Sequence, residues 1–241
     1  MISSLFSYMR ACPSRLRQTA TAGAVLLLAG CSANPIYTTT GVVLSNYSES
    51  EATPYVMQMS DPKMACALGE GVDPLMYSFS RVTSAPDTTG SLLMLLAANC
   101  MEYRTWEAEL DYLRADFSGD IPAAKDAREK AKRLHAQTAK RRYQAFQRAM
   151  AAYDFDPSAE PLECPFLFSE QDELTFLLGL LTGMQAIVND SNSGAMAGVP
   201  RNIAPQAERA AQCVDNEKWG GLPNAVRALV WLLLPVSRYC R

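Results

Sequence analysis

The chain of 241 residues contains a single histidine, His135, and this scarcity excludes several kinds of site. Zinc motifs such as His-x-x-His and His-Glu-x-x-His need a second histidine. The sequence also lacks a Cys-x-x-Cys pair, a Gly-x-Ser-x-Gly elbow and a glycine-rich phosphate loop. These are the local signatures of redox, hydrolase and nucleotide-binding sites, so we expect neither a metal ion nor a cofactor.

An excess of positive charge is missing as well. The 22 lysines and arginines are outnumbered by 25 acidic residues, which gives a formal net charge of −3. A nucleic-acid-binding domain usually carries the opposite balance, so nucleic acid is a poor candidate partner. With 49% apolar residues, the composition is that of an ordinary globular protein.

Pairs of residues suited to acid–base catalysis are also scarce. The carboxylates of Glu107, Glu109 and Asp111 are close in sequence, but on a helix they point to different faces, as expected of a solvated surface. The single histidine, His135, lies inside a basic run without a neighbouring carboxylate or cysteine. We predict that His135 is a surface or packing residue and that the protein is not an enzyme.

The N-terminus carries the most specific motif of the chain, Leu28-Ala29-Gly30-Cys31 after a short apolar run, which resembles a bacterial lipobox. Upstream lie arginines and no acids (Arg10, Arg15, Arg17), as in a signal peptide. The apolar run is too short for a permanent membrane helix. The resemblance implies removal of residues 1–30 and acylation of Cys31; the alternative is an ordinary start with a buried cysteine. Ser32 occupies the position where an Asp would retain an enteric lipoprotein at the inner membrane, so we expect the periplasmic face of an outer membrane.

The rest of the chain divides into two parts. Residues 31–60 are rich in Ser, Thr, Asn and Tyr and are expected to form a lipid-anchored tether with at most a short helix near its end. Residues 61–241 are long enough for one sizeable core and form the predicted helical domain.

Five cysteines remain after Cys12 leaves with the leader and Cys31 takes lipid: Cys66, Cys100, Cys164, Cys213 and Cys240. Because five thiols cannot all pair, one or two bridges, or none, are possible. We favour a bridge between Cys213 and Cys240, since each lies near the end of a predicted helix in one C-terminal hairpin.

Helix signals begin at Asp61-Pro62, where an N-cap acceptor precedes a proline, and they recur at Asp73-Pro74 after Gly69 and Gly71. This repetition predicts a first helix broken in two. Later helices are expected at about residues 88–118, 121–154, 169–188, 205–214 and 223–234. Asn189 to Gly198 is expected to be a loop or short turn.

Two of these helices have distinctive faces. The helix over residues 88–118 carries an apolar stripe and is expected to be buried over much of its circumference: Leu92, Leu95, Leu96, Asn99, Tyr103, Trp106, Leu110 and Leu113. The next helix has a narrow, small-residue stripe that would let another helix approach closely: Ala127, Ala131, Leu134, Thr138, Ala145, Ala149 and Ala152. Ser169 and Asp172 form a predicted capping box. Because no stretch alternates as a strand would, the predicted fold class is all-α, built from helical hairpins.

The order of several motifs resembles the TatT family, the T-component lipoproteins of TRAP transporters. These motifs are Met57 to Lys63, Val72-Asp73-Pro74-Leu75-Met76, Leu92 to Ala98, Ile187-Val188-Asn189-Asp190 and Trp219-Gly220-Gly221. The resemblance implies a TPR-like array, no enzymatic activity, a DctP-type solute-binding protein as partner, an apolar ligand and homo-oligomers. The chain departs from the family in ending at Arg241, which implies a missing terminal helix pair, and in its basic central helix.

That central helix carries a local charge of +7 over residues 125–148. The positive charge would suit an acidic face of a soluble partner or anionic lipid, and the alternative is a solvated face. The candidate partner-binding residues are Lys132, Arg133, Arg141 and Arg142.

Large apolar residues of the other helices are the candidates for binding an apolar ligand, which needs area more than hydrogen bonds. They are Tyr103, Trp106, Phe176, Met184 and Trp231, and the alternative is that all of them are core residues. The predicted function is a periplasm-facing lipoprotein accessory to a TRAP-type uptake system. The alternative is a TPR-like scaffold for envelope proteins without a ligand of its own.

Overall fold

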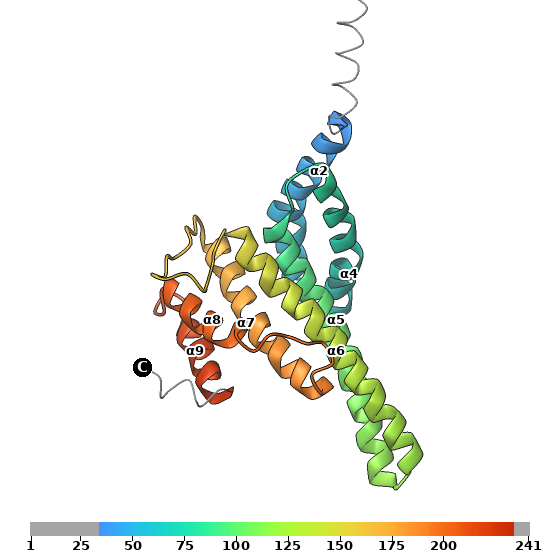
Figure 1. Ribbon diagram of the computed structural model, residues 1–241. Helices are drawn as coiled ribbons and strands as arrows, with labels where there is room; N and C mark the ends of the chain where they lie inside the picture. The colour runs from blue at the N-terminus through green and yellow to red at the C-terminus, as the bar shows by residue number, and fades with distance from the viewer. Residues whose placement is uncertain (1–33, 234–241) are drawn as a thin grey trace, which may run out of the picture.

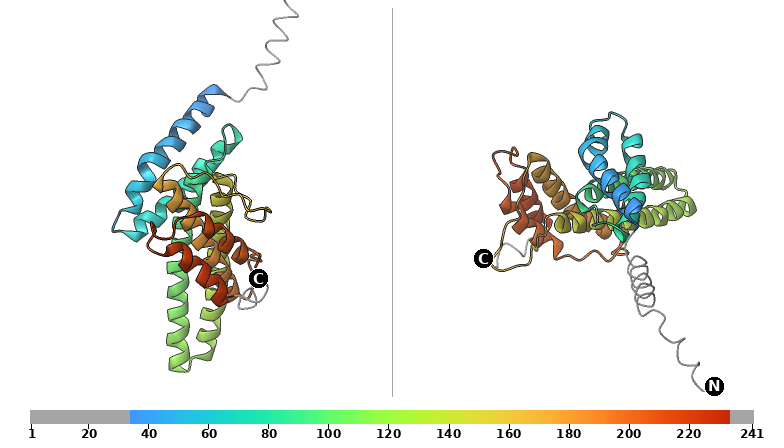
Figure 2. Two further views of the ribbon diagram at one scale, coloured as in Figure 1. Left: turned by 90° about the vertical axis from the view of Figure 1, so that its left-hand side faces the viewer. Right: turned by 90° about the horizontal axis from the view of Figure 1, so that it is seen from above.

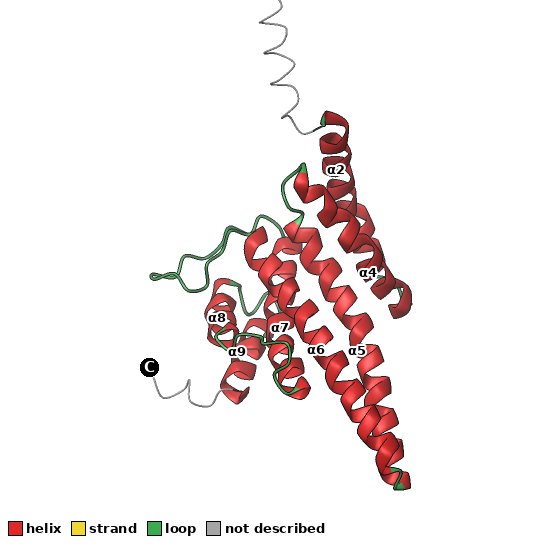
Figure 3. Cartoon of the chain, turned by 45° about the vertical axis from the view of Figure 1, so that its right-hand side comes forward, coloured by secondary structure: helices red, strands yellow, loops and turns green. Residues whose placement is uncertain are grey.

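The computed structural model describes residues 34–233, and within this range helices and loops account for the whole chain, without a strand (Figure 3). The all-α prediction is confirmed. The elements are α2 (Pro35–Tyr47), the π-helix η1 (Ser48–Ala52), α3 (Thr53–Met57), α4 (Pro62–Ser78), the 3-10 turn η2 (Phe79–Arg81), α5 (Asp87–Ser118), α6 (Ile121–Ala152), α7 (Glu170–Ser193), α8 (Ile203–Ala210), the 3-10 turn η3 (Ala211–Cys213) and α9 (Leu222–Leu233).

Local capping explains where the major helices start and stop. The side chain of Asp61 accepts hydrogen bonds from the backbone N–H groups of Lys63 and Met64, at 2.9 and 3.2 Å. Ser169 and Asp172 form the predicted reciprocal capping box at the start of α7. Gly119 follows the C-terminus of α5 and has a φ of 77°, a conformation that glycine adopts without strain. It turns the chain into α6.

The long helices α5 and α6 form an antiparallel hairpin at the centre of the fold (Figure 1). Helix α4 packs antiparallel on α5, and α7 packs antiparallel on α6, while α8 and α9 cover α7 (Figure 2). The Gly119 end of the hairpin extends past the other helices in both views. The hairpin therefore joins two layers and also presents a free end.

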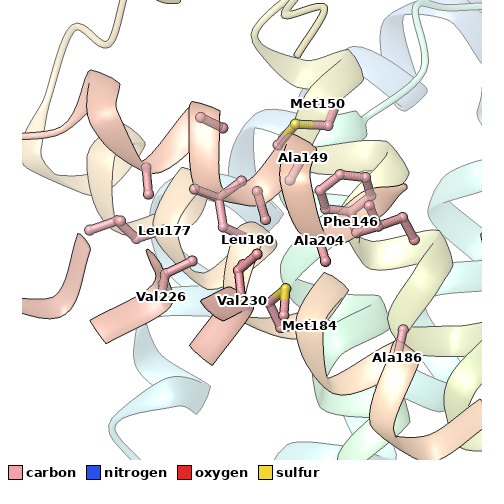
Figure 4. Packing of buried hydrophobic residues seen from close by; sticks show 14 of the residues in the cluster. Phe146, Ala149, Met150, Leu177, Leu180, Met184, Ala186, Ala204, Val226 and Val230 are labelled. Atoms are coloured by element: carbon pink, nitrogen blue, oxygen red, sulfur yellow. The ribbon is translucent and has the colours of Figure 1, made fainter. Parts of the chain in front are cut away.

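The main core lies between α6, α7, α8 and α9 (Figure 4). The predicted close approach at the small-residue stripe of α6 is observed against α7. A Cβ atom added at Gly179 would lie only 2.3 Å from the Cβ of Ala149, and one at Gly183 would lie 2.6 Å from the ring of Phe146. Helices α6 and α7 can pack this closely because each glycine leaves room for the side chain opposite it, Ala149 or Phe146.

Three helix predictions are corrected by the structure. Helix α4 is continuous through Pro74, because packing on both sides of the proline outweighs the single backbone hydrogen bond that proline removes. Residues 35–57, expected to be mostly tether, are almost continuously helical. Helix α7 continues through Ser193, beyond the predicted end near residue 188, and residues 203–210 form α8 slightly earlier than expected.

The predicted burial of α5 holds only for its N-terminal half. Leu92 and Leu96 are buried under neighbouring helices, whereas Leu110 and Leu113 are exposed. Amphipathic spacing shows which face is apolar, but it does not show how far along the helix that face is covered.

The disulfide prediction was wrong. Cys213 pairs with Cys164, which joins the long loop before α7 to η3, and Cys66 pairs with Cys100, which joins α4 to α5. The Cα atoms are 5.3 and 5.1 Å apart, within the usual range. Cys31 and Cys240 lie outside the described residues. Among residues 34–233, none of the helices combines the length and the apolar character that crossing a bilayer requires.

Candidate functional site

Arg142, in the middle of the basic run, is buried inside the fold with only 2% of its surface exposed. Its guanidinium group forms an ion pair with Glu102 of α5 and hydrogen bonds with Gln185 and Thr182 of α7 and Asn99 of α5. Burial lowers the pKa of Arg142, and the charge of Glu102 opposes this shift. A buried charge needs such partners, so Arg142 fastens α6 to both neighbouring helices.

Two further arginines of the run also face the interior. Arg141 donates to Glu70 of α4 and to the backbone oxygen of Ala97, both at 2.6 Å. Arg148 forms an ion pair with the buried Asp73 of α4 and lies 3.6 Å from the centre of the Tyr77 ring. Of the four predicted partner-binding residues, Arg141 and Arg142 therefore bind other helices of the same chain.

Among the other basic residues, Lys125, Arg128 and Lys132 lie on the flank of α6 beside α5. Lys125, Arg128, Lys132 and His135 follow one another at intervals of three, four and three residues, so they form a single row along the helix. Arg133, the fourth predicted partner-binding residue, is exposed on the outer face of α6 instead. Only Lys132 of the predicted set lies in the row.

Two adjacent hollows lie between this row and α5. The one nearer the Gly119 turn measures about 160 Å³ and is lined by Tyr112, Asp116, Gly119, Ile121, Ala124, Lys125 and Arg128. The other measures about 280 Å³ and is lined by Glu109, Tyr112, Arg128, Ala131, Lys132, His135 and Asn192. Because Tyr112 and Arg128 line both, the hollows form one depression, which we call the hairpin groove.

His135 closes the inner end of the hairpin groove. Its Nε2 atom is 2.8 Å from Oε1 of Glu109 on α5, and its Nδ1 atom is 2.9 Å from Oδ1 of Asn189 on α7. The amide nitrogen of Asn189 donates to the backbone oxygen of Gln185 at 3.0 Å, which leaves the amide oxygen facing the ring. Both ring nitrogens are therefore engaged, and the side chain holds α5, α6 and α7 together.

The groove is lined by positive side chains from α6 and by negative side chains from α5. Lys125, Arg128 and Lys132 face Glu109 and Asp116 across the groove. Lys132 also forms an ion pair with Glu129 at 2.7 Å, which lowers the pKa of the Glu129 carboxyl group. Because an exposed ion pair of this kind contributes little, Lys132 can exchange Glu129 for a carboxylate of another molecule.

The predicted apolar-ligand residues do not surround one cavity. Tyr103 and Trp106 are 42% and 49% exposed on α5 and form an edge-to-face pair, with ring centres 5.4 Å apart. Phe176 and Met184 belong to the main core, where Met184 lies among the labelled side chains of Figure 4. Trp231 lies on α9 against Arg227. Neither hollow of the hairpin groove is lined by any of these residues.

Sequence reasoning missed most of the hairpin groove: Glu109, Tyr112, Asp116, Lys125, Arg128, His135 and Asn192. The spacing of the cationic row was visible in the sequence, because it follows the helical repeat. The partners of His135 were not, since Glu109 and Asn189 come from other helices. Within residues 34–233, no cluster of three or more histidine, cysteine or acidic side chains has a metal-binding arrangement.

Comparisons with protein-family models, with curated proteins and with solved structures found no match to this chain.

Proposed function

We propose that the protein is a lipid-anchored envelope protein that binds a soluble protein partner in the hairpin groove. The observation that carries this proposal is the row of Lys125, Arg128 and Lys132 beside an open depression. An acidic segment of a partner fits this chemistry, because its carboxylates can pair with the row while its backbone lies in the groove. The motif resemblance makes a DctP-type solute-binding protein of a TRAP system the expected partner.

The inner end of the groove stands on well-supported helices, which favours specific recognition there. The contacts of His135 with Glu109 and Asn189 fix the helix that carries the row relative to both neighbours. This preformed inner end loses little conformational entropy on binding, so more of its contact energy remains as affinity. Acylated Cys31 at the periplasmic face of an outer membrane would hold this groove within reach of periplasmic proteins.

A scaffold role is favoured over carriage of an apolar ligand by the scattering of the aromatic candidates. A carrier needs its apolar side chains around one cavity. Phe176 and Met184 instead fill the core, and Tyr103 and Trp106 face outward. Native mass spectrometry with solvent extraction of the purified protein distinguishes the two roles. A stoichiometric apolar molecule would establish the carrier role, and an empty folded protein would support the scaffold.

The binding proposal is tested by photocrosslinking in whole cells. A photoreactive phenylalanine analogue replaces Tyr112, which lines both hollows, and a control carries it at the exposed Gln137 of α6. We expect a defined acidic partner to crosslink at position 112 and not at 137, and Arg128→Glu with Lys132→Glu to abolish the product. Equal crosslinking at both positions, or no effect of the charge reversals, would overturn the proposal.

The anchor is tested separately by metabolic labelling with a radioactive fatty acid and by membrane fractionation. We expect the full chain to incorporate label and sediment with outer membranes, and Cys31→Ser to lose the label. Label that persists in Cys31→Ser would refute acylation at that residue, whatever the crosslinking result.

A further inference from the structure

The exposed half of α5 carries a continuous apolar row that the proposed partner groove does not use. Tyr103, Trp106, Leu110, Leu113 and Phe117 succeed one another at alternating steps of three and four residues, and we call this row the α5 seam. The exposed fractions of these residues are 42%, 49%, 44%, 57% and 97%. A strict alternation of three and four is the repeat of a coiled-coil seam, in which every residue of the row faces a partner helix.

The seam continues an interface that is already formed within the chain. Toward the N-terminus the same stripe of α5 runs through Leu96 and Leu92, which are buried. Leu96 packs in one cluster with Val56 of α3 and Ala65 of α4. Past this covering layer the stripe remains apolar but loses its cover, and Figure 1 shows the hairpin extending beyond α4 there. The seam is thus shaped to receive a further helix.

The surface beside the seam contains a recess for side chains of that helix. Leu110, Leu113, Arg114, Asp116 and Phe117 line a shallow hollow of about 480 Å³. In a coiled coil, each apolar side chain of one helix enters a hole formed by side chains of the other. The hollow and the seam together have the form of such an interface.

The size of the seam fits self-association. Its five side chains expose roughly 500 Å² per copy, given that an aromatic residue buries about 150–250 Å². A patch of this size is at the upper end for a lone soluble protein. If both seams were fully covered, two copies would bury about 1,000 Å², which is the threshold for a biological interface and is typical of a weak, reversible dimer.

The covering layer decides the orientation of a second copy. Helices η1 and α3 contact α5, and Val56 of α3 packs with Leu96 in the N-terminal half of α5. In a parallel dimer the covering layers of both copies would meet at the same height and collide. In an antiparallel dimer each exposed seam lies beside the other, and each covering layer lies beyond the end of the other hairpin.

The charges on one flank of the seam are complementary in the antiparallel arrangement. With a twofold axis near Leu110, Glu107 of one copy lies beside Arg114 of the other, and this pair occurs twice. Within one copy Arg114 has only a long surface contact with Asp111, at 3.6 Å, so it is available for the new pair. On the opposite flank the same symmetry brings Glu109 of one copy near Asp116 of the other. This like-charge pair is offset within each copy, because Glu109 contacts His135 and Asp116 lines a hollow together with Lys125 and Arg128.

We propose that the α5 seam is a self-association surface through which two copies of this chain form an antiparallel, twofold-symmetric dimer. The proposal does not depend on the proposed partner groove, which lies between α5 and α6. Symmetry requires the interface to be self-complementary, and both the seam and the Glu107–Arg114 pair meet this requirement.

The first test is cysteine crosslinking of the full chain in whole cells treated with copper phenanthroline. Leu110→Cys, at the proposed axis, is expected to give a covalent dimer on a non-reducing gel. Gln137→Cys, exposed on α6, is the matched control and is expected to behave like the parent chain. Absence of a Leu110→Cys dimer, or crosslinks only to other proteins, would overturn the proposal.

The second test measures the dimer dissociation constant of the full purified chain by sedimentation at constant detergent concentration. Leu113→Glu, a change at an exposed position, is expected to weaken dimerisation at least tenfold while the circular dichroism stays unchanged. Glu107→Arg is expected to weaken it about fivefold, and the double variant Glu107→Arg, Arg114→Glu to restore it. A parent chain that is monomeric, or a double variant as weak as the single one, would refute the antiparallel dimer.

Discussion

Arg142 shows how much of the basic run is used inside the molecule. Its guanidinium group contacts Glu102, Asn99, Thr182 and Gln185, and only its Nε atom has no hydrogen-bond partner. Burying a charge is costly, and the cost is offset only while the ion pair and the hydrogen bonds are complete. Arg142 therefore joins α6 to both α5 and α7, and its loss should destabilise both helix contacts.

We predict that Arg142→Met lowers the free energy of unfolding by about 3 kcal/mol, because it leaves Glu102 and the surrounding amides without their donor. Urea denaturation followed by circular dichroism measures the change. Arg133→Met, an exposed change on the same helix, is the control and should stay within about 0.5 kcal/mol. Adding Glu102→Gln to Arg142→Met should recover part of the loss, and a loss below about 1 kcal/mol would contradict the role assigned to Arg142.

Tyr77 gives the fold a dependence on alkaline pH. Burial, and then the hydrogen bond to Asp87, raise the pKa of Tyr77 to about 12 from an ordinary value of 10.0. The folded chain thus keeps a proton that the unfolded chain releases, so the stabilisation is complete below pH 10 and is lost as pH rises through 12. We predict that Tyr77→Phe flattens the loss of stability over this window in denaturant titrations. Burial also raises the pKa of Tyr153, so part of the slope should persist; an unchanged slope would contradict the prediction.

Sequence reasoning succeeded at residues whose structural role is local. The caps at Asp61 and Ser169 were predictable, because each needs only neighbours within a few positions. The burial of Arg142 and the pairing of Cys164 with Cys213 were not, because their partners are far away in sequence. In the hairpin groove the cationic row follows from helical spacing, but its acidic wall comes from α5.

At the scale of helices, the α4–α5 contact depends on one glycine. A Cβ atom at Gly69 would lie 2.4 Å from the backbone oxygen of Leu93 and 2.6 Å from the backbone nitrogen of Ala97. Backbone atoms cannot move aside as a flexible side chain can. Gly69, interpreted from the sequence as part of a break, instead allows the close approach of two continuous helices.

Two glycine substitutions on α4 separate helix propensity from packing. Gly69→Ala is predicted to destabilise the fold by about 2 kcal/mol or more, because α4 must move away from α5. Gly71→Ala, whose Cβ atom meets open space, should stabilise it by about 0.5–1 kcal/mol through helix propensity alone. Thermal and urea unfolding of both variants measure these changes, and a stabilising Gly69→Ala would refute the close contact.

Considered as a whole, the molecule has a well-packed centre and a thinly supported end. Helix α6 is packed between α5 and α7 along its C-terminal half, where Ala139, Ala145 and Ala149 are buried. The Gly119 end of the hairpin extends past α4 and α7 (Figures 1 and 2). The α5 seam and the outer half of the hairpin groove lie on this projecting part, whereas the inner half of the groove lies beside α7. The helical spacing of both rows is visible in the sequence, but their exposure follows only from the assembled fold.

Hydrogen exchange can measure this difference in support. We predict that backbone amides near Gly119 exchange at least tenfold faster than those of α6 around Ala145 and Ala149, because local opening there exposes little core. Uniform protection along the hairpin would contradict the packing described. In addition, protection over residues 103–117 should increase with protein concentration in the parent chain and not in Leu113→Glu, since a second copy would cover the seam only when dimers form. Protection that is independent of concentration in both chains would argue against self-association at this surface.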